Sequence, residues 1–324
     1  MWQEIKSKVL EGEGLTREEA FALAGWPPEK LGELLNLSRQ VRQRFGGREV
    51  ELCSIINARS GLCSEDCRFC AQSSRYRTGA KTYPLIGPEE ALEKARRMEA
   101  AGARRFALVT SGRGIGEQDF GRVLDIYRVL RAETRLELCA SLGIIDGEKA
   151  RRLREAGVTT YHHNLETSRS YFPNICTTHT FEERVMTIRT AQAAGLKVCS
   201  GGIIGMGEVL ADRLEMVLEL RELGVTSVPV NILNPIPGTP LAGQKFLPVE
   251  EIFKTLALFR LIMPRAVLRL CGGREPGLRE KQQKALKMAI NGLMIGNYLT
   301  TRGNEVQEDL DMIAAAGLRL AAGG

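Results

Sequence analysis

The chain has 324 residues, 44% of them hydrophobic, and a formal net charge of +6 from 45 basic and 39 acidic residues. That length suits a single α/β barrel. The chain has neither the ~18 uninterrupted apolar residues of a membrane helix nor a signal-peptide core at its start. Its basic residues alternate with acidic ones, as on solvated helix faces, and form no stripe for nucleic acid. We therefore expect a cytoplasmic protein with no membrane or nucleic-acid partner.

The first 47 residues predict helices rather than strands. Amphipathic patterns cover residues Thr16–Ala24 and Pro28–Phe45. No later linker is rich enough in proline, glycine or serine to divide the rest. We expect a helical extension over residues 1–47 and one further domain over residues 48–324.

From about residue 89 the chain repeats one pattern: an amphipathic helix, a glycine, then a β-branched or apolar run. The glycines are Gly102, Gly157, Gly195 and Gly224. Glycine is favoured just past a helix C-terminus because it adopts the left-handed conformation without strain. The helices that precede these glycines are predicted at Glu89–Ala101, Ala150–Ala156, Phe181–Ala194 and Asp212–Leu223.

Eight segments have the composition of buried strands. They are Val50–Ile56, Arg105–Thr110, Leu136–Ala140, Val158–His162, Leu196–Ser200, Val225–Val230, Ala266–Cys271 and Leu293–Ile295. Strands that alternate with helices form parallel sheets, and eight such units predict a closed (β/α)8 TIM-type barrel. The proline-rich run over residues 234–240 is then a long loop at the active-site rim.

Three cysteines stand within eight residues at C-x3-C-x2-C spacing: Cys63, Cys67 and Cys70, with Phe69 before the last. Three thiolates can hold three irons of a [4Fe-4S] cluster and leave the fourth iron open, as catalytic metal sites do. The alternative is a structural zinc knuckle, which needs a fourth ligand. No histidine stands at finger-like spacing from these cysteines, so we favour the cluster.

Four further cysteines fall on predicted strands one, three, five and seven: Cys53, Cys139, Cys199 and Cys271. In a barrel of this kind the four side chains of one interior layer come from alternate strands. The four thiols are therefore expected to converge on the barrel axis as ligands of a second, auxiliary iron–sulfur cluster. The alternative for each is a small core side chain. Cys176, in a loop, is assigned no role.

The C-x3-C-x2-C motif resembles the radical S-adenosylmethionine superfamily, in which the open iron binds S-adenosylmethionine. Further stretches resemble the biotin synthase family: residues 63–77 (CSEDCRFCAQSSRYR), 163–168 (HNLETS) and 198–203 (VCSGGI). The resemblance implies a radical enzyme that inserts sulfur into dethiobiotin to form biotin, with S-adenosylmethionine and two iron–sulfur clusters.

The resemblance also implies roles for single residues. Asn164 and Glu166 match positions that contact S-adenosylmethionine and substrate, although the family commonly has Asp where Glu166 stands. Asn231 matches an amide that holds the ureido ring, and Arg269 matches an arginine ligand of the second cluster. One position departs from the pattern, because Ala107 stands where the family's second-strand cysteine is expected.

Cys53 and Cys271 are additions to the pattern, and Cys271 lies on the same strand face as Arg269. We therefore expect an all-cysteine auxiliary cluster, with four irons as the first choice and [2Fe-2S] as the alternative. The expected partners are an electron donor of the flavodoxin or ferredoxin type, a sulfur or cluster-assembly donor, and a second copy of the chain. The alternative functions are a relative of hydrogenase maturases or methylornithine synthase, and an iron–sulfur carrier.

Overall fold

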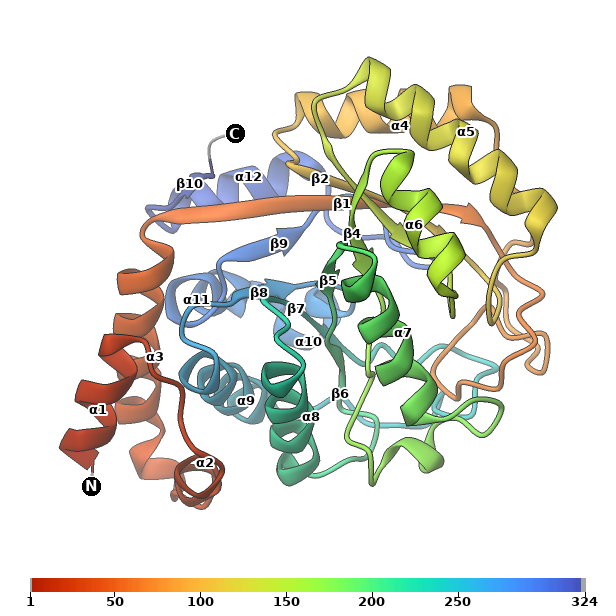
Figure 1. Ribbon diagram of the computed structural model, residues 1–324. Coiled ribbons are helices and arrows are strands. Elements are labelled where there is room, and N and C mark those ends of the chain that lie inside the picture. The colour runs from red at the N-terminus through yellow and green to blue at the C-terminus, as the bar shows by residue number, and fades with distance from the viewer. Residues whose placement is uncertain (1, 322–324) are drawn as a thin grey trace.

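The computed structural model describes residues 2–321, and its centre is a closed barrel of eight parallel strands (Figure 1). Register pairs join each barrel strand to the next, and the pairing of β9 with β1 closes the ring. The barrel strands are β1 (Glu49–Arg59), β2 (Arg105–Thr110), β3 (Glu137–Ser141), β4 (Val158–His162), β5 (Lys197–Cys199), β7 (Ser227–Ile232), β8 (Val267–Leu270) and β9 (Gly292–Met294). The predicted (β/α)8 barrel is confirmed.

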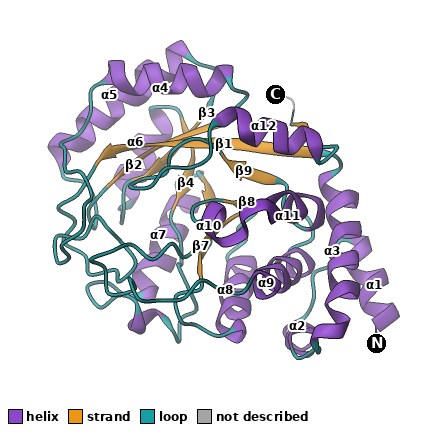
Figure 2. Cartoon of the chain, turned by 180° about the vertical axis from the view of Figure 1, so that it is seen from behind, coloured by secondary structure: helices purple, strands orange, loops and turns teal. Residues whose placement is uncertain are grey.

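Helices surround the strands on the outside of the barrel (Figures 1 and 2). They are α4 (Pro88–Ala100), α5 (Glu117–Glu133), α6 (Gly147–Glu155), α7 (Phe181–Ala193), α8 (Leu210–Glu222), α9 (Val249–Ile262), α10 (Arg274–Leu278), α11 (Gln282–Met288) and α12 (Val306–Ala315). The four glycines predicted to follow helices all have positive φ, from 69° at Gly224 to 102° at Gly157. Left-handed glycine therefore ends the helices that lead into β2, β4, β5 and β7.

Two short strands lie outside the eight that the sequence predicts. Strand β6 (Gly202–Ile204) pairs with β7 beyond the end of β5, and β10 (Arg319–Leu320) pairs with the start of β1. The break between β5 and β6 falls at two glycines packed against backbone. A Cβ on Gly201 would lie 1.9 Å from the Pro229 carbonyl oxygen, and one on Gly202 would lie 2.3 Å from that of Glu166. Only glycine lets these segments approach so closely.

The N-terminal helices pack against the outside of the barrel beside α9 and α11 (Figure 1). They are α1 (Trp2–Glu11), α2 (Arg17–Ala24) and α3 (Leu31–Gly46), the last preceded by a short 3-10 turn, Pro28–Lys30. The buried Arg42 fixes α3, because its Nε donates to the carbonyl oxygens of Leu286 and Ile290 at 3.1 Å. Within residues 2–321 no helix combines the length and apolarity that a membrane span requires.

Candidate active site

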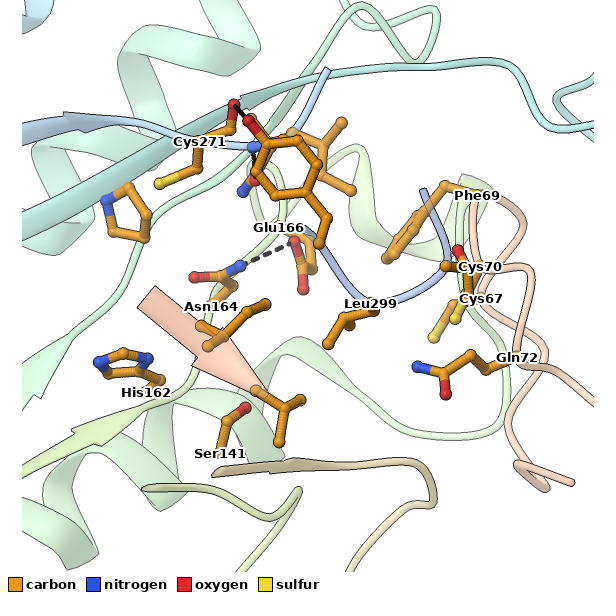
Figure 3. A pocket seen from close by; sticks show the side chains of 18 of the residues that line it. Cys67, Phe69, Cys70, Gln72, Ser141, His162, Asn164, Glu166, Cys271 and Leu299 are labelled. Carbon is orange, nitrogen blue, oxygen red and sulfur yellow. Dashed lines mark hydrogen bonds between the residues drawn. The ribbon is translucent and has the colours of Figure 1, made fainter. Parts of the chain in front are cut away.

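A cavity of about 420 Å³ occupies the barrel interior and opens at the carboxyl ends of the strands. This is the end of the fold at which TIM barrels carry their active sites. Cys67, Phe69 and Cys70 lie on one side of the cavity, and Cys271 and His162 lie on the other (Figure 3). Asn164 and Glu166 stand between the two groups. The cavity therefore joins the cysteine loop to the barrel interior.

The cysteine loop, residues 60–74, follows β1 and folds back on itself. The backbone N–H of Cys63 donates to the Gln72 carbonyl at 3.0 Å, and that of Ser74 donates to the Cys63 carbonyl at 2.8 Å. The amide of Cys70 donates to the Cys67 carbonyl at 2.9 Å, which places these two residues one turn apart. All three cysteines are free thiols that line the cavity, together with the half-buried Phe69.

A second loop, between β4 and α7, covers this cysteine loop. Asp66 joins the two, because its carboxylate accepts from the backbone N–H groups of Thr177 at 2.9 Å and Thr178 at 3.2 Å. Although partial burial raises the pKa of Asp66, the hydrogen bonds from Thr177 and its neighbours hold that pKa well below its usual value. The carboxylate therefore stays ionised at neutral pH and ties the loops together.

The covering loop also brings Cys176 and His179 to the cysteine loop. Cys67, Cys176 and His179 place ligand atoms within 4.8 Å of one another. Over the described residues 2–321 this is the only such group, so Cys63, Cys67 and Cys70 do not converge on a single ion as a zinc knuckle would. Three thiols spread around a loop fit a larger group such as an iron–sulfur cluster.

Asn164 and Glu166 lie just beyond β4 and face the middle of the cavity (Figure 3). Glu166 has φ of 70°, which is rare for a residue with a side chain. Backbone pairing holds it there, because its N–H donates to the Gly201 carbonyl at 3.1 Å and its carbonyl accepts from Ile203 at 2.9 Å. The Asn164 side chain donates to the Glu166 carboxylate at 3.4 Å and accepts from the Gly201 N–H at 3.2 Å.

The Glu166 carboxylate is buried beside one cation. Burial raises its pKa, whereas the Arg184 guanidinium, 3.8 Å away, lowers it, and the net pKa is raised. Arg184 also donates to the Asn164 carbonyl at 2.8 Å. The carboxylate is thus fixed in place while its free edge faces the cavity.

Asn231, near the end of β7, is held by both ends of its amide. Its Oδ1 accepts from the Gly272 N–H at 3.0 Å, and its Nδ2 donates to the Gly202 carbonyl at 3.3 Å. A side-chain amide has two N–H donors and two acceptor lone pairs, so one donor and one acceptor remain for the cavity that Asn231 lines. An amide pinned in this way offers a fixed donor–acceptor pair.

All four strand cysteines are buried: Cys53, Cys199 and Cys271 line the cavity, whereas Cys139 packs against Ile55 and Ala107. The sheet register shows which residue lies level with each cysteine two strands away. Glu137 lies level with Cys53, Lys197 with Cys139 and Val267 with Cys199. Because tilted barrel strands advance one residue per strand, the same layer is reached two residues further on. The layer is therefore Cys53, Cys139, Cys199 and Arg269, and Cys271 lies one layer nearer the carboxyl ends. The expectation that all four cysteines share one layer is wrong.

Burial makes three of these thiols poor acids unless a cation is present. It raises the pKa of Cys53, raises that of Cys139 to about 12, and raises that of Cys271 well above its usual value. Cys199 Sγ lies 3.1 Å from the Ser227 hydroxyl oxygen. Convergent buried thiols fit a metal cluster, because metal ions stabilise the thiolate form that burial disfavours.

Arg269 lies in this layer, and three of its five guanidinium N–H donors are engaged by Ser227 and Glu51. Its Nε donates to the Ser227 hydroxyl at 3.0 Å, and its Nη2 donates to the Glu51 carboxylate. Burial would lower the pKa of Arg269, but the negative charges of Cys53, Glu51 and Cys199 raise it instead. A second cation, Arg105, contacts Glu51 at 3.1 Å. Both arginines face the thiols and favour negative charge there.

His162 ends β4 and lies on the same side of the cavity as Cys271 (Figure 3). Burial, then the charges of Arg269 and Arg105, lower its pKa to about 3, so the imidazole is neutral at pH 7. No role in the site was predicted from the sequence for His162, Cys176 or His179. The Cys176-x2-His179 spacing was the available signal, because two ligand-type residues three positions apart lie close together in a turn.

The sequence also matches known families. Residues 59–221 match the radical SAM superfamily, and residues 229–319 match the biotin and thiamin synthesis associated domain. Biotin synthase from Pelotomaculum thermopropionicum is 59% identical over 97% of this chain and 98% of its own length. Biotin synthases from Heliobacterium modesticaldum and Clostridioides difficile are 52% and 48% identical, each over 98% of both chains.

Solved structures share the fold at much lower identity. Methylornithine synthase superposes with a TM-score of 0.83 at 21% identity, over 98% of this chain and 97% of its own. A maturase of [FeFe]-hydrogenase gives a TM-score of 0.83 at 16% identity, over 98% of this chain and 75% of its own. Identities this low support the barrel alone. The choice among the three functions therefore rests on the more similar sequences.

Proposed function

Because the chain belongs to the biotin synthase family of radical S-adenosylmethionine enzymes, which insert sulfur into dethiobiotin, we propose that the barrel cavity is the site of that insertion. One observation carries the proposal: a single cavity has the cysteine loop at one side and Cys271 at the other (Figure 3), and Cys53 and Cys199 also line it. A substrate in its middle would face both groups.

Cys63, Cys67 and Cys70 are proposed to hold a [4Fe-4S] cluster whose open iron binds S-adenosylmethionine. When bound, this cluster and the auxiliary one supply the electron that cleaves S-adenosylmethionine and the sulfur that is inserted. Phe69, in the same loop, lines the cavity and is proposed to contact the bound S-adenosylmethionine. The loop's backbone hydrogen bonds fix the three thiols before any cofactor arrives.

Asn164 and Glu166 are proposed to bind S-adenosylmethionine through its ribose. A carboxylate can accept from two neighbouring hydroxyls at once. Arg184 supports this role, because its positive charge favours the ionised carboxylate that burial opposes. Glu166 is longer than the aspartate common in the family, and its positive φ and its pairing with Gly201 set where that extra length points.

Asn231 is proposed to bind the ureido ring of dethiobiotin. A urea presents N–H donors and a carbonyl acceptor side by side, and the pinned amide offers one complementary acceptor and one donor. Because the amide is already fixed by Gly272 and Gly202, little conformational entropy is lost when it binds.

The auxiliary cluster is proposed to have Cys53, Cys139, Cys199 and Cys271 as its ligands and to contain four irons. Ser227 and Glu51 hold the Arg269 guanidinium through its Nε, Nη1 and Nη2, which supports a role as electrostatic neighbour rather than ligand. The alternative is a [2Fe-2S] cluster that keeps Arg269 as a ligand. Iron per chain separates the two: about seven or eight supports four irons in the barrel, whereas about six supports the alternative.

The remaining proposals concern the setting of the reaction. We propose a cytoplasmic homodimer with residues 1–47 as helical extension and residues 48–324 as catalytic barrel. A flavodoxin or ferredoxin would supply electrons to the cluster at the cysteine loop. A sulfur or cluster-assembly donor would restore the sulfur that each turnover removes from the barrel.

The test is an anaerobic reaction of reconstituted protein with S-adenosylmethionine, reductant and dethiobiotin, followed by mass spectrometry. We expect biotin together with about two equivalents of 5′-deoxyadenosine, one for each C–S bond. Deoxyadenosine without biotin would support the radical chemistry but contradict dethiobiotin as the substrate. The absence of both products from protein that holds both clusters would favour an iron–sulfur carrier.

A further inference from the structure

Cys176 is the one cysteine of the chain outside both proposed ligand sets, and it touches one of them. Its side chain is buried, with 3% of its surface exposed. Its sulfur lies 3.8 Å from Cys67 Sγ, although the two residues are 109 positions apart. That distance is within the range of a hydrogen bond between sulfurs and too long for a disulfide.

The loop around Cys176 is tied to the cysteine loop on both sides of this contact. Asp66, the neighbour of Cys67, binds the N–H groups of Thr177 and Thr178. The backbone N–H of Arg68, on the other side, donates to the Ile175 carbonyl at 2.9 Å. The residues beside each cysteine are therefore paired, so the two sulfurs are held at this separation by backbone and carboxylate contacts.

The imidazole of His179 fixes where protons lie around Cys176. Arg184 is always a donor, and its Nε donates to His179 Nε2 at 3.1 Å. The proton of a neutral imidazole must then sit on Nδ1, which lies 2.5 Å from a Glu65 carboxylate oxygen and 3.3 Å from Cys176 Sγ. His179 therefore directs a donor, not an acceptor, toward the Cys176 sulfur.

Once Cys67 is bound to iron, three acceptors lie near the Cys176 thiol: Cys67 Sγ at 3.8 Å, Asp66 Oδ1 at 3.3 Å and Thr178 Oγ1 at 3.6 Å. Thr178 Oγ1 already accepts from the Asp66 N–H at 3.2 Å. Asp66 Oδ1 already accepts from the N–H groups of Thr177 and Thr178 and from the Thr178 hydroxyl at 3.0 Å. With three donors on that oxygen, Cys67 is the less crowded acceptor. As a free thiol, Cys67 donates to Cys176 across this contact. Bound to iron, the Cys67 sulfur is a thiolate without a proton, so only Cys176 can then donate.

We propose that Cys176 is a positioning residue whose thiol donates a hydrogen bond to Cys67 Sγ and so raises the reduction potential of the cluster at the cysteine loop. This rests on the proposed role of Cys67 as an iron ligand. Hydrogen bonds to ligand sulfurs raise cluster potentials because they stabilise the extra negative charge of the reduced state. Cys176 thus makes the cluster easier to reduce without binding iron itself.

The experiment is redox titration of the reconstituted protein, followed by the electron paramagnetic resonance signal of the reduced cluster that changes when S-adenosylmethionine is added. This signal separates the loop cluster from the one in the barrel. Cys176→Val removes the donor at similar volume, and Cys176→Ser restores a hydroxyl donor. Thr187→Val is the control, because it removes a buried hydroxyl on α7 that bonds only within its own helix, to the Glu183 carbonyl.

We expect Cys176→Val to shift the potential of the loop cluster to a more negative value, with its iron and its KM for S-adenosylmethionine unchanged. Cys176→Ser should return the potential toward that of the unchanged protein, and Thr187→Val should not move it. An unchanged potential in Cys176→Val would overturn the proposal. A shift to a more positive value would overturn it too, because it would indicate that Cys176 is an anionic thiolate beside the cluster. Loss of the loop cluster from both Cys176 variants would overturn it as well, by making Cys176 a requirement for cluster retention.

The same measurements separate this inference from the assignment on which it rests. If the unchanged protein gives no signal that responds to S-adenosylmethionine, the proposed role of Cys67 has failed. If that signal is present and the variants leave its potential unmoved, only the role of Cys176 has failed.

Discussion

The two thiol groups of this protein are built in opposite ways. The cysteine loop gathers Cys63, Cys67 and Cys70 from eight consecutive residues and shapes them by local backbone hydrogen bonds. The barrel thiols come from four strands spread over more than 200 residues and meet only through sheet register. The cysteine loop lies at the rim of the cavity, whereas the barrel strands surround the second thiol group and leave it open only to the cavity.

This difference matches the two tasks that the proposed reaction sets. A cluster that binds S-adenosylmethionine must admit a large cofactor, so its ligands belong on a loop at the cavity rim. A cluster that gives up sulfur must be held where water does not compete, and the barrel interior provides that.

The largest effect is expected from removing a loop thiol. Cys63→Ala should abolish both S-adenosylmethionine cleavage and biotin formation, because a two-cysteine loop cannot hold the cluster. The barrel cluster should remain, because the strand register does not depend on Cys63. Product analysis and iron content test this, with Leu62→Ala as the control, since Leu62 is 77% exposed. Biotin formation by the Cys63 variant would remove the loop from the mechanism.

Asn231→Leu should impair substrate binding while it spares the loop. We expect KM for dethiobiotin to rise by about ten- to a hundredfold, the cost of one or two lost hydrogen bonds. Deoxyadenosine formation should persist without matching biotin. Asn231→Asp keeps the acceptor for the Gly272 N–H and should show a smaller rise in KM. Equal KM values in both variants and the unchanged protein would place dethiobiotin elsewhere in the cavity.

Gly202→Ala should disturb Glu166 through the backbone alone. Its Cβ would lie 2.3 Å from the Glu166 carbonyl oxygen and 2.4 Å from Met216 Sδ, so one of the segments must move. We expect a loss of about 1–3 kcal/mol in unfolding free energy and a higher KM for S-adenosylmethionine. Gly121→Ala, on α5 with open space at its Cβ, is the matched control. A normal KM in the Gly202 variant would argue against Glu166 as a ligand.

The smallest effect concerns pH. His163 is buried beside the cavity, and burial holds its pKa well below the usual 6.5. Its folded form stays neutral, whereas the unfolded chain binds a proton below pH 6.5, so stability is lost as pH falls through that value. We expect His163 to contribute a loss of about 1.4 kcal/mol between pH 7.5 and 5.5. Urea unfolding of His163→Asn should show a correspondingly flatter pH dependence.

The contrast between the two thiol groups also explains what could be predicted from the sequence. The loop motif is contiguous, and strand positions follow from periodicity, so the triad and the eight barrel strands were predictable. The layer that Cys271 occupies depends on the tilt of the strands. Arg269, and not Cys271, lies in the layer of Cys53, Cys139 and Cys199. Cys176 reaches Cys67 through a loop clamped by Asp66, a contact with no periodic signal.

The most direct test of the two-site account is Cys271→Ala in reconstituted protein, assayed for iron, S-adenosylmethionine cleavage and biotin together. The account predicts that iron falls to about four per chain, that deoxyadenosine still forms and that biotin does not. Normal iron with normal biotin in that variant would remove Cys271 from the ligand set and contradict the proposed all-cysteine barrel cluster.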